Sequence, residues 1–152
     1  MDDCVFCRIL SGDLPAHFVY QDELVAAFLS LEQPNPYKVL VVPRHHVETV
    51  YDLKDAQAAA IFQATVKISR AVRDASGCEG LNLVQSNGKA GQQDVFHFHL
   101  HIVPRFYTGR FRRKVLKTPL GLRNSFRNIR SAPSTPAPIA APNRPLNRWP
   151  SG

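Results

Sequence analysis

Three histidines, His97, His99 and His101, occupy every second position of the stretch HFHLHIV. Residues two apart on a β-strand point to the same face, so the three imidazoles should lie together. They could be polar residues on a solvated face, or the three protein ligands of a catalytic metal such as zinc. They could also form a catalytic site, because imidazole is a good nucleophile toward phosphorus or acyl carbon. Spacing alone leaves these alternatives open.

The residues between the histidines are apolar and predict the opposite face of the same strand. Phe98, Leu100 and Ile102 should face the core. We expect the strand to span residues 95–103 and to be closed by Pro104.

A cysteine pair, Cys4 and Cys7, forms a second candidate site near the N-terminus. A Cys-x-x-Cys redox motif needs a preceding strand, and only three residues precede Cys4. A zinc site needs two further ligands, and the sequence has no second Cys-x-x-Cys. Two buried thiols remain an alternative. We assign no function to the third cysteine, Cys78.

The segments around these residues predict an α+β fold with an antiparallel β-sheet and one principal α-helix. A short helix over 4–12 should end at Gly12. Strands are expected over residues 17–22, 24–31, 39–43 and 81–86, followed by a glycine-containing loop over 87–92.

The principal helix is predicted over residues 54–76. Asp52 is the expected N-cap and Gly77 the expected C-cap. One apolar stripe with the helical period consists of Ile61, Thr65, Ile68 and Val72.

The net charge of +7 is unevenly distributed along the chain. Residues 1–109 hold 9 Lys and Arg against 12 Asp and Glu, whereas residues 110–152 hold 10 Lys and Arg and no acid. The basic character therefore belongs to a tail that is rich in Arg and then in Pro and Ala, and we expect this tail to be disordered. Any nucleic-acid binding should depend on the tail.

The sequence has no run of about 20 apolar residues, so no membrane span is expected. The acidic N-terminus lacks the pattern of a signal peptide, which predicts a cytoplasmic location.

Several segments together resemble the histidine triad (HIT) superfamily of nucleotide hydrolases and transferases, in its bacterial zinc-containing branch. They are CVFCRILSGDLPAHFVYQDELVAAFL, LVVPRHHV and GLNLVQSNGKAGQQDVFHFHLHIVPRF. The resemblance covers about residues 4–107, which suggests a HIT-like catalytic domain over 1–109 and a separate tail over 110–152.

The resemblance implies a covalent mechanism at the α-phosphorus of a nucleotide. His99 matches the nucleophile that forms a nucleotidyl-imidazole intermediate. His101 matches the histidine that contacts phosphate and assists the leaving group, and Gln93 matches a phosphate-binding glutamine. The expected substrate is a nucleoside phosphoramidate or dinucleoside polyphosphate, with a purine base. The expected assembly is a homodimer. A nucleotide-binding protein with little turnover and an enzyme acting on adenylated DNA ends are the alternatives.

The resemblance also implies a structural zinc site and no organic cofactor. Its four ligands would be Cys4, Cys7, His46 and His97, although a shift of one residue would replace His46 by His45.

The nucleoside pocket departs from the family pattern. Ser30 stands where an aspartate commonly binds ribose, and Leu31 beside it is expected to line the base pocket. Ser86 or Asn87 would supply a phosphate contact. Tyr37-Lys38 replaces a common Gly-His pair.

Overall fold

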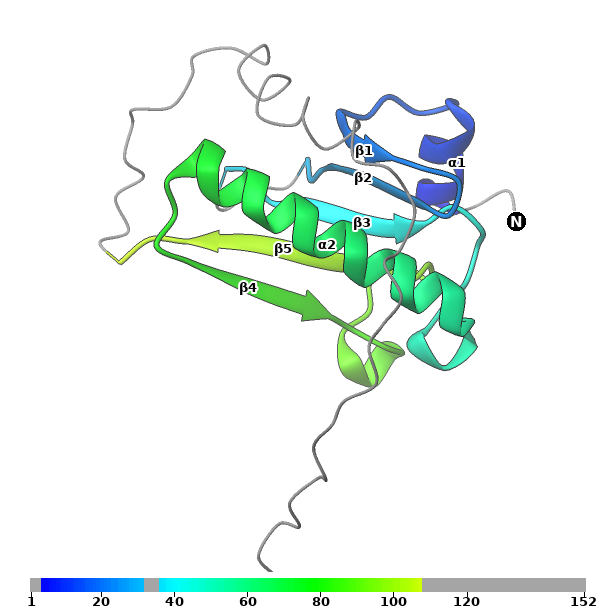
Figure 1. Cartoon of the computed structure of the whole chain (residues 1–152). Coiled ribbons are helices and arrows are strands. Elements are labelled where there is room, and N and C mark those ends of the chain that lie inside the picture. Colours follow the sequence, from blue (N-terminus) through cyan, green and yellow to red (C-terminus); the bar gives the residue numbers. More distant parts are fainter. Residues whose placement is uncertain (1–3, 32–35, 108–152) are drawn as a thin grey trace, which may run out of the picture.

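The computed structural model describes residues 4–31 and 36–107, which are built on a five-stranded antiparallel sheet (Figure 1). The strands lie in the order β1-β2-β3-β5-β4. Their bounds are Phe18–Gln21 (β1), Val25–Leu29 (β2), Val39–Pro43 (β3), Gly80–Gln85 (β4) and Leu100–Arg105 (β5). The predicted α+β class is confirmed. The predicted disordered tail, residues 110–152, lies outside the described residues.

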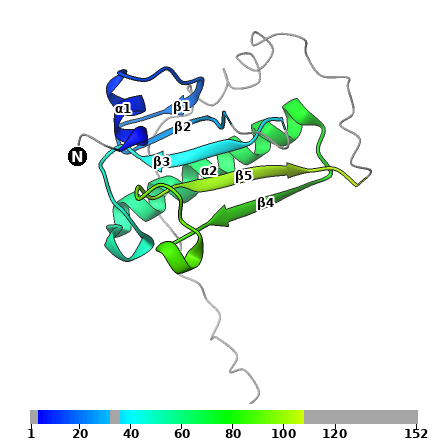
Figure 2. The same ribbon diagram turned by 180° about the vertical axis from the view of Figure 1, so that it is seen from behind.

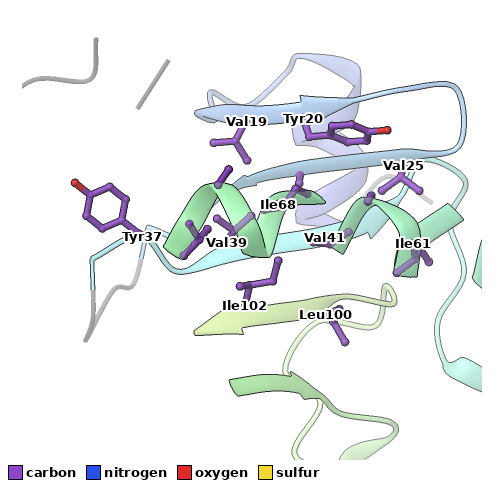
Figure 3. Close-up of a cluster of buried hydrophobic side chains, with 14 of the residues drawn as sticks. Val19, Tyr20, Val25, Tyr37, Val39, Val41, Ile61, Ile68, Leu100 and Ile102 are labelled. Atoms are coloured by element: carbon purple, nitrogen blue, oxygen red, sulfur yellow. The ribbon is translucent and has the colours of Figure 1, made fainter. Parts of the chain in front are cut away.

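Helix α2, Asp55–Ser76, covers one face of the sheet. The predicted apolar stripe is confirmed, since Ile61, Thr65, Ile68 and Val72 are all buried. Figure 3 shows Ile61 and Ile68 against the side chains of β3 and β5. The contacts of α2 define the first of two core clusters, which lies between this helix and the sheet.

The ends of α2 agree with the prediction at one terminus only. Gly77 is the C-cap, in the left-handed conformation with φ of 64° that glycine adopts readily. The predicted N-cap, Asp52, is wrong, because the helix begins later and Lys54 is the N-cap. The Lys54 amide donates to Gln57 Oε1 at 3.1 Å, whereas Asp52 ends the 3₁₀ helix η1, Val50–Asp52.

Helix α1, Val5–Ser11, lies on the opposite face of the sheet and ends at Gly12 as predicted (Figure 2). Phe6 and Ile9 of α1 form a second core cluster with the side chains of β2 and β3 that point away from α2. Strand β3 is therefore buried on both faces, which explains its continuous run of apolar residues.

The predicted strand over residues 95–103 is wrong in its first half. Strand β5 begins only at Leu100, so His97 and His99 precede it. The Phe98 amide donates to Val47 O at 2.6 Å, and the His97 amide donates to Val95 O at 2.9 Å. The His97 amide is thus used within its own loop and the Phe98 amide by the segment after β3, so neither enters the sheet ladder.

The predicted alternation of faces is nevertheless confirmed. Phe98, Leu100 and Ile102 are buried in the cluster beneath α2. The His97 and His99 rings contact Phe6 of α1, on the other side of the sheet. The histidines therefore lie on the α1 face.

Within residues 4–31 and 36–107, no helix has the length and apolar character needed to cross a lipid bilayer.

Candidate metal centre and catalytic histidines

Two cysteines and two histidines come together where α1 meets the sheet. Cys4 is the N-cap of α1 and Cys7 lies in its first turns, while His46 follows β3 and His97 precedes β5. One ligand atom from each residue lies within 4.8 Å of the other three. These four residues could hold a metal ion.

The distances within this cluster fit a tetrahedral ion. His97 Nδ1 lies 3.4 Å from Cys4 Sγ and 3.6 Å from Cys7 Sγ, and His46 Nδ1 lies 3.3 Å from Cys7 Sγ. Ordinary zinc–sulfur and zinc–nitrogen bond lengths place sulfur and nitrogen ligands about 3.6 Å apart at the tetrahedral angle. Two thiolates and two imidazoles are also a common donor set for structural zinc.

His97 is oriented so that Nδ1 is available to a metal. Its ring is fully buried, and Nε2 lies 3.0 Å from Pro43 O. A carbonyl only accepts, so Nε2 carries the hydrogen and Nδ1 has a free lone pair facing the thiols. Burial lowers the pKa of His97 and so favours the neutral form that binds metals.

The thiol of Cys7 favours its protonated form when no cation is bound. Partial burial, together with the hydrogen bond and charge of Cys4, raises the pKa of Cys7 to about 11. A metal ion favours the thiolate, so binding here would release protons.

The geometry favours His46 over His45 as the fourth member of the cluster. His46 supplies a ligand atom to the cluster, and its ring lies edge-on to His97 with centroids 5.0 Å apart. His45 supplies none among the described residues.

His99 has the arrangement of a nucleophile. Its ring is 5% exposed, and Nδ1 donates to His97 O at 2.7 Å. This bond leaves Nε2 without a hydrogen and with its lone pair free. Burial lowers the pKa of His99, which favours the neutral imidazole.

His101 lies beside His99, with ring centroids 4.8 Å apart. Burial, followed by the charges of His99 and Lys38, lowers its pKa to about 4. Its Nδ1 is buried and has no hydrogen-bond partner among the described residues. A buried nitrogen without a partner is costly, so a ligand contact at this atom would be stabilising.

Phe6 links the two groups of histidines, and the sequence analysis missed it. Its ring packs edge-on against His97 at 5.8 Å and against His99 at 5.2 Å between centroids. Phe6 lies between the two cysteines of CVFC, and this position was the available signal.

Gln93 is placed differently from its predicted contact with phosphate. Its amide nitrogen donates to Glu48 O at 2.7 Å and to Val95 O at 3.1 Å. Its Oε1 accepts from the Gly88 amide at 2.7 Å. Both amide hydrogens are used, so none is left for a phosphate oxygen, and this geometry favours a positioning function.

The side chain of Asn87 also makes hydrogen bonds within the protein, in contrast to the side chain of Ser86. Asn87 Oδ1 accepts from the Val50 amide, and its Nδ2 donates to Gln85 Oε1. The Ser86 hydroxyl has no partner within residues 4–31 and 36–107. Val84 pairs with His101, so alternation past the end of β4 puts Ser86 on the histidine face. Ser86 is the better candidate for a phosphate contact.

The predicted nucleoside residues lie at the end of β2. Ser30 is buried, and Leu31 is 86% exposed. In the described part of the chain, Leu31 therefore lines no enclosed pocket.

Comparison with known proteins identifies the family that this fold and site define. The HIT domain model matches residues 11–108. Protein hit of Bacillus subtilis is 44% identical over 108 residues, which are 71% of this chain and 74% of that protein. The chain therefore belongs to the HIT domain family.

Two further relatives bear on the chemistry of the site. Adenosine 5'-monophosphoramidase hnt1 of Schizosaccharomyces pombe is 33% identical over 102 residues, covering 67% of this chain and 74% of the enzyme. A zinc-bound histidine triad family protein from Mycobacterium smegmatis is 31% identical with a TM-score of 0.74, covering 86% of this chain and 97% of the other.

We predict that protonation of His101 destabilises the fold in acid. Its folded pKa of about 4 lies below the unfolded value of 6.5. The neutral ring therefore contributes its full stability above pH 6.5, and this contribution is lost as pH falls through about 4. Urea unfolding of wild type and His101→Gln between pH 7 and pH 4 should show a weaker pH dependence in the variant. An NMR titration midpoint of His101 near 6.5 would contradict the prediction.

Proposed function

We propose that the protein is a nucleotidyl hydrolase that acts through a covalent intermediate on His99. The observation that carries the proposal is the bond from His99 Nδ1 to His97 O, which leaves Nε2 of a buried, neutral imidazole free. The substrate is a nucleoside phosphoramidate or a dinucleoside polyphosphate, with a purine base preferred. The relation to an adenosine monophosphoramidase supports this class.

The reaction has two displacements at the α-phosphorus. In the first, the Nε2 lone pair of His99 forms a bond to phosphorus, and the bond from phosphorus to the leaving group breaks. In the second, water attacks phosphorus and the P–Nε2 bond breaks, which returns His99 and releases the nucleoside monophosphate. The first displacement expels an amine or a nucleotide; the amine must be protonated to leave, whereas the nucleotide can leave as a phosphate anion.

His101 is suited to supply that proton once substrate is bound. In the free protein its low pKa keeps the ring neutral. An anionic phosphate beside the ring raises the pKa, so the ring can take up a proton from solvent and donate it to the leaving group. Gln93 holds the loop before the histidines, and Ser86 supplies a hydroxyl contact to phosphate.

The metal in this proposal is zinc, bound by Cys4, Cys7, His46 and His97. When bound, it has a structural function, because all four ligand positions are filled by the protein. The metal then fixes the position of the His97 ring, and the backbone carbonyl of His97 orients the ring of His99. The activity belongs to residues 1–109.

We expect His99→Ala to abolish turnover while leaving the protein folded. Without the nucleophile, kcat should fall on the order of 10⁴-fold or more. The substrates are adenosine and guanosine phosphoramidates and diadenosine polyphosphates. Single-turnover intact-mass measurements should detect a nucleotidyl adduct in wild type and none in the variant. His17→Ala, at an exposed histidine, is the control. Undiminished turnover in His99→Ala would contradict the proposal.

A second prediction concerns zinc. Wild type purified without chelator should hold about one zinc per chain, and His46→Ala should hold less than about half as much. His45→Ala is the matched control, since it removes the adjacent imidazole without touching the cluster. Metal content is measured by mass spectrometry. Equal zinc in all three proteins would contradict the ligand set.

The proposed assembly is a homodimer formed by α2 and the outer edge of β4. Exposed apolar side chains gather there: Phe62 and Val66 lie one turn apart on α2, and Leu83 and Val84 lie on β4. β4 is the last strand of the sheet, so its free backbone groups can pair with a second copy. Pairing would join the two sheets.

We predict that Phe62→Glu with Val66→Lys converts the dimer to a monomer. Light scattering should give twice the 17.0 kDa chain mass for wild type and the chain mass for the double variant. Leu24→Lys, in the turn between β1 and β2, should leave the dimer intact. A wild-type monomer at micromolar concentration contradicts the assembly.

A further inference from the structure

Lys38 lies directly before β3, and its neighbours indicate which face its side chain occupies. Tyr37 and Val39 are buried in the cluster beneath α2. Leu40 belongs to the cluster on the α1 face and pairs with His101 of β5. Because side chains alternate along a strand, Lys38 shares the face of Leu40 and His101.

Lys38 is held in this position by its own backbone. Tyr37 has φ of 70°, a conformation that is unusual for a bulky residue, and its ring is 7% exposed. The Ser30 amide donates to Lys38 O at 2.9 Å. The segment that leads into β3 is therefore held by the burial of Tyr37 and by the hydrogen bond to Lys38 O.

The ammonium group of Lys38 has no hydrogen-bond or ion-pair partner among the described residues. Its side chain is partly buried, and its positive charge lowers the pKa of both His99 and His101. Asp94 is the opposing charge, since it raises the pKa of the same two histidines. No ion pair joins Lys38 to Asp94 in the described part of the chain.

Such a cation beside two neutral imidazoles is suited to bind an anion. The ammonium offers three donors, and charge-assisted hydrogen bonds to phosphate oxygens are among the strongest that side chains form. Nδ1 of His101, on the same face of the sheet, is buried and has no hydrogen-bond partner among the described residues. A phosphate group placed here would satisfy both residues.

We infer that Lys38 is a substrate-binding residue whose ammonium contacts the non-bridging oxygens of the reacting phosphate of a nucleotide, beside His101. The inference rests on the proposed function for its site, but it concerns phosphate recognition, which is measurable without turnover. Lys38 makes the site select phosphorylated ligands over uncharged nucleosides. Asp94, on an exposed part of the loop, limits how much negative charge the site accepts.

The experiment measures binding of AMP, adenosine and pyrophosphate to the full chain by calorimetry. Lys38→Gln should raise the Kd for AMP about tenfold or more and leave the Kd for adenosine within about twofold. Lys38→Arg should keep most of the affinity, because the charge remains. Added salt should weaken AMP binding less in Lys38→Gln than in wild type.

The matched control is Lys67→Gln, which removes the same charge from α2, where Lys67 Nζ lies 6.0 Å from the Tyr20 ring centroid. It should bind AMP as wild type does. Equal AMP affinity in wild type and Lys38→Gln, or equal weakening of AMP and adenosine, would overturn the inference. If pyrophosphate binds in a manner that depends on Lys38 but AMP does not bind, the nucleotide function fails and the phosphate contact stands. If neither anion binds wild type, both fail.

Discussion

The rest of the site depends on one residue, His97, whose ring and backbone carbonyl both make contacts. Its Nε2 donates to Pro43 O on β3, and its Nδ1 faces the two thiols of α1. Its backbone carbonyl accepts the hydrogen of His99 Nδ1. One residue therefore connects the sheet, the N-terminal helix and His99, the proposed nucleophile. A flip of the His97 ring would break its bond to Pro43 O and turn Nδ1 away from the thiols, whereas the bond from His99 goes to the backbone carbonyl.

Burial has different effects on the two faces of the sheet. Beneath α2 it stabilises the fold through apolar contacts. On the α1 face it lowers the pKa values of His97, His99 and His101, which favours the neutral form that metal binding and nucleophilic attack both require. The charges of Lys38 and Asp94 then act on rings that carry no charge of their own. The site can therefore gain charge when substrate arrives.

The sequence was sufficient for features that follow from periodicity. The alternation through Phe98, Leu100 and Ile102 predicted both faces, and the helical stripe predicted α2. The sequence was insufficient where long-range backbone hydrogen bonds determine where a strand begins. The sheet ladder begins only at Leu100 because the Phe98 amide goes to Val47 O, a partner that no local pattern indicates. The bond from Gln93 to Glu48 O is likewise tertiary, and a resemblance of sequence gives the residue type without giving its hydrogen-bond partners.

The separation of the cluster's ligands along the chain has a consequence for biosynthesis. Cys4 and His97 are 93 residues apart, so the cysteines leave the ribosome long before their last partner. Closing so large a loop costs little more entropy than closing one half its length, but it cannot begin until the final strand is being made. A nascent chain would therefore hold the cysteine pair without His97 through most of the synthesis of residues 4–107, whereas Phe6 could already pack against Phe28 of β2. The proposed catalytic histidines, His99 and His101, would take their positions after the other parts of the cluster have been made.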